Sequence, residues 1–471
     1  MAKFSRKPAV ATGNVVRRSN NRLIDGLLQG GKWVYDNSYR VITYAFQDTA
    51  WGSWDATFKA AVQSALQAWS QVTNFVFSQV ATGISPFYNT ADLTFFLTGD
   101  QLYTQTGSVA MSVFPDPQHT STALGLLSAT FGTHFTDQNY PKAEGDVFID
   151  HAYGGFQFLQ PGSYGLATLI HEVGHSLGLK HPHDDGENNR PTFGDLEIGE
   201  YDNGRWTVMS YNSPDNASLA DGNPSTPMPL DILAIQHVYG ANPNTNRGST
   251  TYNLADDGRV FTIWDTGGTD WLNGFSLNQG VEVDLQAGGF TRISATSLVA
   301  IAFNVTIEHA TGSNFEDTLT GNSIANRLLG GEGNDLLRGL AGNDTLEGGN
   351  GDDQLVGGTG QDRLSGGDGA DRFVITAMGQ GKDFLVDFQS GEDKIDLAGE
   401  GESEFVGYGA ENFIATADGR PLTAQDNFIY NTSRRLLTFD VDGSGARSAV
   451  PLLQLAVGSS LQVEDILFAA T

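Results

Sequence analysis

The chain contains no cysteine among its 471 residues. Disulfide bonds and thiolate metal sites are therefore excluded, and any metal ion must rest on histidine and oxygen ligands. Basic residues are also scarce, because 26 lysines and arginines stand against 55 acidic residues, for a formal net charge of −29. This charge would repel nucleic acids and anionic membrane surfaces, so we expect neither as a partner. Divalent cations would balance it.

Long apolar runs are lacking too. No stretch approaches the roughly 18 consecutive apolar residues of a membrane-spanning helix, so we expect no membrane span. The first twenty residues carry basic side chains but not the apolar run of a secretory signal. We expect 1–20 to be a short leader or propeptide.

Two domains are expected at this length. Short segments rich in β-branched and aromatic residues predict strands over 41–47, 74–80, 91–99 and 145–150. Apolar residues at helical spacing and helix boundary signals predict helices over 54–72, 164–177 and 229–240. Residues 21–240 therefore form an α+β domain, and 241–471, where helical periodicity fades and glycine rises, form a second domain.

The segment TLIHEVGHSLGLKH contains the pattern H-E-x-x-H-x-x-G-x-x-H. Residues four apart on a helix share a face, so His171 and His175 can present ring nitrogens to one ion. Gly178 can take the left-handed conformation that ends the helix, which lets the chain return with His181 as the third ligand. Three neutral ligands leave one position for water, as in a catalytic zinc site.

Glu172 follows the first of these histidines but points toward the open position rather than onto the metal. There it can act as the general base that takes a proton from the attacking water and hands it to the leaving amine. Two unrelated histidines on a helix would explain a lone H-x-x-x-H. They would not explain the glutamate, the glycine and the third histidine together, so the motif predicts a zinc-dependent hydrolase.

Five nonapeptides follow one another without a gap: GGEGNDLLR, GLAGNDTLE, GGNGDDQLV, GGTGQDRLS and GGDGADRFV. They match the G-G-x-G-x-D-x-U-x pattern of calcium-binding parallel β-helices. Two less regular repeats, here called the worn turns, precede them. Asp317 and Asn326 occupy the position of the repeat aspartate in these turns. A flexible glycine-rich linker is the alternative, but the regular apolar phase of Leu337 and its equivalents argues against it.

In each unit we expect six residues to form a turn and three a short strand. Glycines let the backbone fold its carbonyls onto an ion, and aspartate adds charge, so calcium is expected between successive turns and coupled to folding. The candidate calcium ligands in the repeats are Gly330, Gly331, Gly333, Asp335, Gly339, Gly342, Asp344, Gly348, Gly349, Gly351, Asp353, Gly357, Gly358, Gly360, Asp362 and Asp371.

The zinc motif, the TVMSYN segment after it and the nonapeptides together resemble the serralysin family of metzincin proteases. The resemblance implies an α+β zincin domain with a mixed, mostly parallel sheet, followed by an all-β parallel β-roll. It implies that Met209 forms a hydrophobic floor beneath the three imidazoles. Tyr211 would bind the resting zinc weakly and swing to stabilise the oxyanion. PMPLDILAIQHVYG resembles the helix that closes the protease domain.

Further calcium ligands are implied by the resemblance alone, namely Asp265, Gly267, Asp270, Thr306 and Glu308. Solvated loop carboxylates are the alternative for these positions. In NRGSTTY, Ser249 replaces the aspartate of the family, so we expect no strong site there. The loop PHDDGENNRP after the third histidine is richer in charge than the family's loop, and the rim of the cleft is expected to differ.

The resemblance also implies a secreted, extracellular endopeptidase of broad specificity, whose peptide substrate adds antiparallel to an edge strand. The candidate strands are ADLTFFLTG and GSVAMSVFPDP. Export would use a type I secretion apparatus that reads the C-terminal segment VEDILFAAT, for which an ordinary final strand is the alternative. A proteinaceous inhibitor is the other partner considered, and a monomer is expected.

Two other functions are compatible with parts of the sequence. A catalytically spent, calcium-dependent adhesin or surface protein on the same scaffold would account for the acidity and the repeats, but not for an intact Glu172 and Tyr211. A zinc enzyme acting on a non-peptide amide would keep the metal and change the substrate.

Overall fold

The computed structural model describes residues 10–12, 16–34, 40–81, 91–99, 102, 106–115, 120–131, 143–184, 190–213, 222–375, 377–397, 399, 403–442 and 449–468. The predicted leader lies partly outside these residues, as do parts of the loop after the third histidine and the last three residues of the C-terminal segment. The chain divides into two compact units. The first comprises 1–247, 257–266 and 295–303, and the second comprises 248–256, 267–294 and 304–471.

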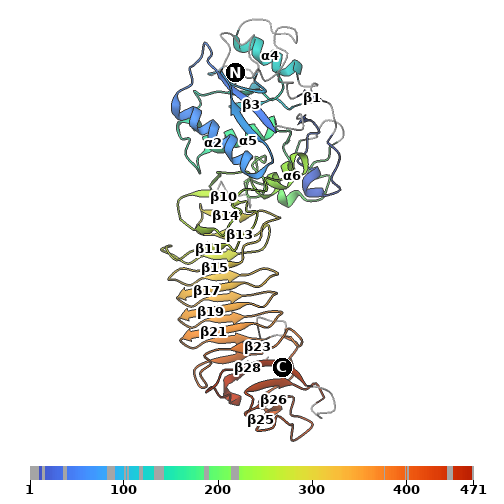
Figure 1. Cartoon of the computed structure of the whole chain (residues 1–471), viewed down its shortest axis with the longest axis vertical. Coiled ribbons are helices and arrows are strands. Elements are labelled where there is room, and N and C mark those ends of the chain that lie inside the picture. The colour runs from blue at the N-terminus through green and yellow to red at the C-terminus, as the bar shows by residue number, and fades with distance from the viewer. Residues whose placement is uncertain are drawn as a thin grey trace. The chain divides into compact units, whose positions relative to one another are not determined.

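A five-stranded sheet lies at the centre of the first unit (Figure 1). Its strands, in spatial order, are β4 (Val76–Gln79), β3 (Val41–Gln47), β5 (Leu93–Leu97), β7 (Val147–Ile149) and β6 (Ala110–Ser112). All neighbours are parallel except β6, which runs antiparallel to β7. The predicted strand over 91–99 is therefore an interior strand, whereas GSVAMSVFPDP contains the edge strand β6.

The helices of this unit include the three that were predicted, over 54–72, 164–177 and 229–240, and others that were not. They are α1 (Arg22–Asp25), α2 (Ala56–Val72), α4 (Thr120–Phe131), α5 (Tyr164–Ser176) and α6 (Pro229–Tyr239). Helix α2 begins where the Asp55 carboxylate accepts the Phe58 N–H, and its buried stripe includes Trp69. The Trp69 indole donates to the Ile170 carbonyl at 3.0 Å, which ties α2 to α5.

Shorter elements complete the first unit. Strands β1 (Val10–Thr12) and β2 (Lys32–Val34) pair antiparallel, and β10 (Arg259–Ile263) pairs in parallel with β8 (Asn223–Pro224) and β14 (Leu298–Ile301). Two 3₁₀ turns cover Gly154–Gln157 and Gly199–Tyr201.

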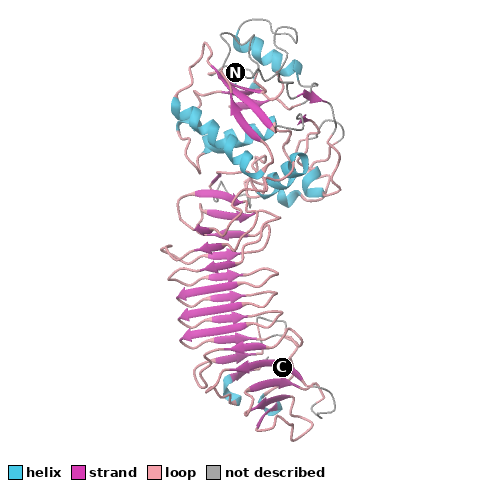
Figure 2. Cartoon of the chain, viewed as in Figure 1, coloured by secondary structure: helices cyan, strands magenta, loops and turns pink. Residues whose placement is uncertain are grey.

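The second unit consists mainly of short strands in two sheets (Figure 2). One sheet has the order β29 (Ile466–Leu467), β24 (Lys394–Asp396), β22 (Arg372–Val374), β20 (Gln354–Val356), β18 (Leu336–Arg338), β16 (Thr318–Thr320), β12 (Glu282–Asp284) and β13 (Phe290–Arg292). The other has the order β25 (Phe413–Thr416), β26 (Phe428–Asn431), β27 (Leu436–Phe439), β28 (Val450–Leu455), β23 (Asp383–Leu385), β21 (Arg363–Asp368), β19 (Thr345–Asn350), β17 (Arg327–Glu332), β15 (His309–Thr311), β11 (Trp271–Asn273) and β9 (Thr251–Asn253).

Successive repeats alternate between these two sheets, so parallel neighbours are 18 residues apart, as for Leu337 and Leu355. The predicted apolar phase is buried throughout: Leu319, Leu328, Leu337, Leu346, Leu355, Leu364 and Phe373 are at most 1% exposed. Strands β17, β19 and β21 have six residues rather than the expected three, because the first glycines of the next turn remain paired, as Gly331 is with Gly349.

The predicted fold class is confirmed: a mixed, mostly parallel α+β unit is followed by a parallel β-roll. Within the described part of the chain, no helix combines the length and apolar character that crossing a membrane requires.

Candidate metal centre and calcium roll

Helix α5 carries the H-E-x-x-H motif and has defined ends. At its start the Ser163 hydroxyl accepts the Leu166 N–H at 3.3 Å. After its end Gly178 has a φ of +101°, and a Cβ there would lie 2.5 Å from the Gly31 carbonyl oxygen. A side chain at position 178 would meet both backbone strain and a collision, so glycine is needed for the turn.

The segment after this turn is held by the residues that follow α1. The Gln29 N–H donates to the Gly178 carbonyl at 3.0 Å, and the Lys180 N–H donates to the Leu27 carbonyl at 2.9 Å. These backbone bonds bring the chain back beside α5. His181 is thereby placed opposite the two helical histidines.

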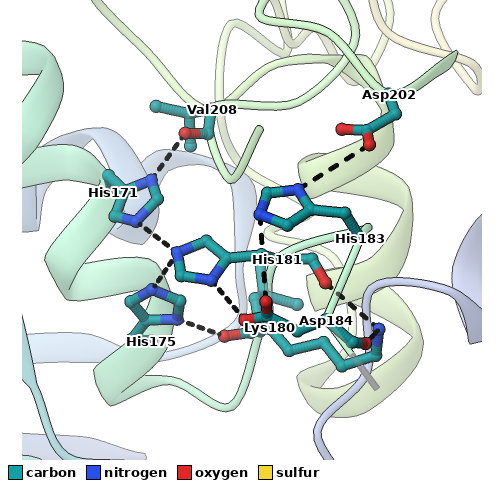
Figure 3. Close-up of polar contacts among 9 residues, drawn as sticks. His171, His175, Lys180, His181, His183, Asp184, Asp202 and Val208 are labelled. Carbon is teal, nitrogen blue, oxygen red and sulfur yellow. Dashed lines mark hydrogen bonds and ion pairs between the residues drawn. The ribbon is translucent and has the colours of Figure 1, made fainter. Parts of the chain in front are cut away.

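The Nε2 atoms of His171, His175 and His181 converge (Figure 3). His181 Nε2 lies 3.1 Å from His171 Nε2 and 3.0 Å from His175 Nε2. Tetrahedral zinc, with Zn–N distances of about 2.0–2.1 Å, keeps its ligand atoms about 3.3–3.4 Å apart. The three nitrogens therefore fit one zinc ion after a shift of a few tenths of an ångström.

Each of the three rings has an acceptor for its other nitrogen. His171 Nδ1 lies 2.8 Å from the Val208 carbonyl, and His175 Nδ1 lies 2.7 Å from the Leu179 carbonyl. His181 Nδ1 contacts the Asp184 carboxylate. These acceptors assign the ring proton to Nδ1 and leave the Nε2 lone pairs facing one another, an arrangement that a cation relieves.

Burial keeps the helical histidines neutral. It lowers the pKa of His171 to about 3 and the pKa of His175 well below its usual value, and the neighbouring rings add to both shifts. Neutral imidazole is the form that binds zinc. Both helical histidines are therefore in the form that can bind zinc.

Met209, which was expected to form the floor beneath the imidazoles, lies beneath α5 in the turn of residues 207–210, here called the Met-turn. Met209 is fully buried, with its Sδ against Gly174. The preceding residue supports the histidine cluster, since Val208 accepts from His171 and its own N–H donates to the Asp231 carboxylate at 2.7 Å. Asp231 also accepts from the Thr207 hydroxyl at 2.5 Å and from the Met228 N–H at 2.8 Å, so α6 fixes the turn.

Glu172 and Tyr211 line the same cleft as His171. Glu172 is 5% exposed, and among the described residues its Oε2 has no hydrogen-bond partner. Burial raises the pKa of Glu172 to about 8. Tyr211 is 69% exposed, and its ring centroid lies 4.4 Å from that of His181.

The cleft has a volume of 510 Å³ and lies within the first unit. One wall is the segment that leads into the edge strand β6, another is the first half of α5, and the rest comes from the Met-turn segment and from β8 and β10. Lining side chains of these elements include Ser108, Tyr164, Thr168, Arg205, Val208, Pro224 and Val260. The cleft therefore joins an open sheet edge to the three-histidine cluster.

In the roll, each repeat aspartate bonds the turn stacked before it. Asp353 Oδ1 accepts the Asp335 N–H at 2.8 Å, and Asp362 Oδ1 accepts the Asp344 N–H at 2.9 Å. The other carboxylate oxygen, Oδ2, is buried in all five repeat aspartates. Among the described residues it has no hydrogen-bond partner; the five are Asp335, Asp344, Asp353, Asp362 and Asp371. Those five aspartates belong to the five well-formed repeats.

The worn turns differ at the same atom. Asp317 Oδ2 accepts the Ser313 N–H at 2.6 Å, and Asn326 Oδ1 accepts the Asn322 N–H at 2.7 Å. At these two turns a backbone N–H therefore bonds the oxygen that has no such donor in the well-formed repeats. Five buried carboxylate oxygens without a donor, surrounded by glycine backbone, fit calcium, which prefers such oxygen ligands.

The predicted glycine ligands have two different roles. One group adopts a positive φ, namely Gly331, Gly333, Gly342, Gly349, Gly351, Gly358 and Gly360. A Cβ on Gly349 would lie 1.9 Å from the Gly331 carbonyl oxygen of the stacked turn. The first glycine of a repeat instead lies against its own aspartate, as a Cβ on Gly330 would be 2.2 Å from Asp335 Oδ2; Gly339, Gly348 and Gly357 are equivalent.

The calcium ligands suggested by the resemblance alone are brought together only in part. In the second unit the Asp270 N–H donates to Glu308 Oε2 at 2.7 Å, and Asp270 Oδ1 accepts the Thr250 N–H at 2.7 Å. Gly267 has a φ of +124°, and Thr306 is exposed. Asp265 belongs to the first unit, where it is buried.

Sequence reasoning missed the residues that orient the histidines. Asp184, Leu179 and Val208 supply the Nδ1 acceptors. Two of these use backbone carbonyls, which leave no signal in the sequence. Asp184 itself, an acidic residue three positions after the last histidine of the motif, could have been recognised as a candidate partner of that histidine.

Two protein-family models match the chain. The model described as Peptidase M10 serralysin C terminal matches residues 230–468, which is slightly more than half of the chain. The model described as Matrixin matches residues 32–198, which include the three histidines.

Curated relatives agree with these models. Serralysin from Proteus mirabilis is 32% identical over 280 residues, which are 55% of this chain and 53% of that protein. Metallopeptidase AprA from Pseudomonas marginalis is 32% identical over 318 residues, which are 61% of this chain and 60% of the relative. Serralysin C from Dickeya chrysanthemi is 36% identical over 190 residues, 36% and 39% of the two chains. The matches thus span between about two-fifths and three-fifths of these relatives. Because the serralysin C-terminal model matches residues 230–468, more than half of the chain, the chain belongs to the serralysin family of M10 peptidases.

Proposed function

We propose that the chain is a secreted zinc-dependent endopeptidase that hydrolyses peptide bonds of extracellular proteins. The observation that carries this proposal is the convergence of the Nε2 atoms of His171, His175 and His181 beside the buried carboxylate of Glu172. Three ligands and an adjacent base are the minimum for metal-assisted hydrolysis.

Zinc held by the three nitrogens would polarise the scissile carbonyl and lower the pKa of a water molecule to about 7. Glu172 takes the proton of the attacking water and delivers it to the leaving amine, for which a raised pKa is suitable. The Tyr211 phenol, beside the His181 ring, donates a hydrogen bond to the carbonyl oxygen as it gains charge.

The substrate peptide pairs antiparallel with β6. The Val109 carbonyl accepts the Asp150 N–H, and the Val113 N–H donates to the Asp146 carbonyl, so both residues use backbone groups on the β7 side. Backbone N–H and C=O groups alternate in direction along a strand, so those of Ala110 and Ser112 point away from β7, toward the open edge. Pairing through the main chain favours broad specificity.

Calcium is the proposed ligand of the roll, at the five repeats whose aspartate Oδ2 has no donor among the described residues. Folding there would be coupled to calcium, so a chain in calcium-free cytosol would stay unfolded for export and fold outside. A type I secretion apparatus, a proteinaceous inhibitor and a monomeric state are the further parts of the proposal, as are the ligands Asp265, Gly267, Asp270, Thr306 and Glu308.

The deciding experiment is casein hydrolysis by the purified chain with and without a zinc chelator, compared with Glu172→Ala. We expect cleavage that the chelator stops and zinc restores, and a loss of at least about 10³-fold in kcat for the variant. Zinc content measured on the same samples separates loss of the base from loss of the metal. Equal cleavage by both proteins would refute the role of Glu172.

A further inference from the structure

A short charged loop follows the third histidine of the motif. Within it, an oxygen of the Asp184 carboxylate contacts His181 Nδ1 (Figure 3). The Lys180 ammonium donates to the Asp184 carbonyl at 2.8 Å and to the His181 carbonyl at 3.1 Å. Because Lys180 is 1% exposed, one buried cation holds the backbone at both ends of the segment 181–184.

The outer oxygen of the same carboxylate faces a further histidine. Asp184 Oδ1 lies 3.8 Å from His183 Nε2, and His183 Nδ1 lies 3.7 Å from Asp202 Oδ2. Asp202 Oδ1 in turn accepts the Ser210 hydroxyl at 2.5 Å. A row of alternating carboxylates and imidazoles therefore runs from the Met-turn segment to the third histidine.

The His183 ring also packs on the cluster directly. Its centroid lies 5.3 Å from that of His181 with an angle of 6° between the planes, and 5.4 Å from that of Tyr211. His183 thus stacks on the ring of the third histidine and lies beside Tyr211.

The third histidine needs such support more than the other two. His171 and His175 are anchored in α5, and their Nδ1 atoms bond backbone carbonyls. His181 lies on a loop outside any helix or strand, and its Nδ1 partner is a side chain. A carboxylate partner makes a stronger, charge-assisted hydrogen bond and raises the donor power of the opposite nitrogen.

We propose that Asp184 is a positioning residue for the third zinc ligand, and that His183 and Asp202 hold its carboxylate in place. The proposal rests on the proposed function, since it assumes that His181 Nε2 binds zinc. Asp184 would fix the His181 tautomer with the proton on Nδ1, orient the ring and slow its release from the metal. Residues 183 and 184 of the charged loop would then support the metal site.

The test measures zinc affinity by competition with a chromogenic chelator, in wild type, Asp184→Asn and Asp184→Ala. Loss of the side chain that hydrogen-bonds a metal ligand typically weakens metal binding about 10- to 100-fold. We expect a graded increase in the zinc dissociation constant, largest for Asp184→Ala and smaller for Asp184→Asn, because the asparagine oxygen can still accept from Nδ1. The half-exposed Asp184 side chain makes both variants compatible with folding, which circular dichroism checks.

Glu197→Gln is the matched control. It removes an exposed carboxylate, 92% exposed, whose ion pair with Arg22 spans 4.0 Å, and leaves the histidines untouched. We expect its zinc affinity to equal that of wild type. Equal affinity in wild type and Asp184→Ala would overturn the proposal while leaving the peptidase function intact, whereas a wild type without zinc affinity would overturn the peptidase proposal itself.

A double-variant cycle tests whether His183 acts on zinc binding through Asp184. If His183 acts through Asp184, His183→Ala weakens zinc binding several-fold in wild type but has no further effect in Asp184→Ala. Independent effects would overturn the role given to His183. Binding of two zinc ions by wild type, with one lost in Asp184→Ala, would show that Asp184 is a metal ligand and would overturn the positioning role.

Discussion

Gly174 on α5 lies directly against the thioether of Met209: a Cβ on Gly174 would come within 2.6 Å of Sδ and 3.1 Å of the Trp69 ring. The glycine lies between Glu172 and His175, so the helix can approach the Met-turn only where its side chain is absent. This contact explains why the sequence between the two helical histidines contains a residue that is otherwise unfavourable in a helix.

Gly174→Ala should therefore destabilise the first unit. Overpacking costs about 1–3 kcal/mol, which exceeds the gain of about 0.5–1 kcal/mol from placing alanine in a helix. We expect a net loss of about 1–2 kcal/mol in urea unfolding and weaker zinc binding. Gly199→Ala, at a position with no atom within 4 Å of a new Cβ, should be neutral. A Gly174→Ala protein as stable as wild type would contradict the close contact.

Tyr211→Phe should lower kcat without loss of metal. The ring is 69% exposed, so its hydroxyl contributes little to stability, but it lies beside His181 at the mouth of the cleft. Removal of one donor to a developing oxyanion costs about 10²- to 10³-fold in kcat. Peptide hydrolysis and zinc content measured together would check this, and an unchanged kcat would exclude the hydroxyl from the reaction.

Asp353→Asn should raise the calcium concentration at which the roll folds, on the order of tenfold, because it removes the charge of one buried Oδ2. Its hydrogen bond to the Asp335 N–H can survive through Oδ1. The control is Asp352→Asn, which changes the exposed neighbouring carboxylate. Circular dichroism during calcium titration gives both midpoints, and coincident midpoints would remove Asp353 from the calcium site.

The calcium-free roll should be more stable in mild acid than at alkaline pH. Burial raises the pKa of Asp335, Asp344 and Asp353 to about 7, above their usual value of 3.8. Groups raised in this way favour the folded state fully below about pH 4, and that contribution is lost as pH rises through 7. Calcium needs the ionised carboxylates, so its affinity should change in the opposite direction.

The measurement is far-UV circular dichroism between pH 5 and 8, with chelator and with calcium. In chelator we expect more β structure at pH 5 than at pH 8, and a calcium midpoint that is lower at pH 8 than at pH 6. More β structure at pH 8 in chelator would show that the aspartates are not buried in the calcium-free roll.

Local patterns predicted three helices and four strands of the first unit and the strands of the repeats. The helix over 54–72 was visible from its apolar stripe and is found as α2 at 56–72, and the helix over 164–177 is found as α5 at 164–176. The nonapeptide phase predicted the buried ladder that includes Leu337 and Leu346. These features repeat at the period of the element that they form, and a period can be seen without knowledge of contacts.

The edge of the sheet could not be predicted. Both 91–99 and 107–117 have the composition of strands, and the order of strands depends on pairing between distant segments, which places β5 inside and β6 at the edge. The hydrogen bonding of the worn turns was equally hidden, since only contacts show that the Ser313 N–H donates to Asp317.

The sequence by itself determined the identity of the three histidines, the glutamate between them and the phase of the calcium roll, because each depends on residue type at a fixed spacing. Only the tertiary structure decided how the histidines are oriented. The acceptors for His171 and His175 are backbone carbonyls, and the acceptor for His181 is Asp184, a side chain that nothing in the motif requires. Ring orientation depends on where the chain brings an oxygen to each Nδ1, and that is set by folding rather than by spacing.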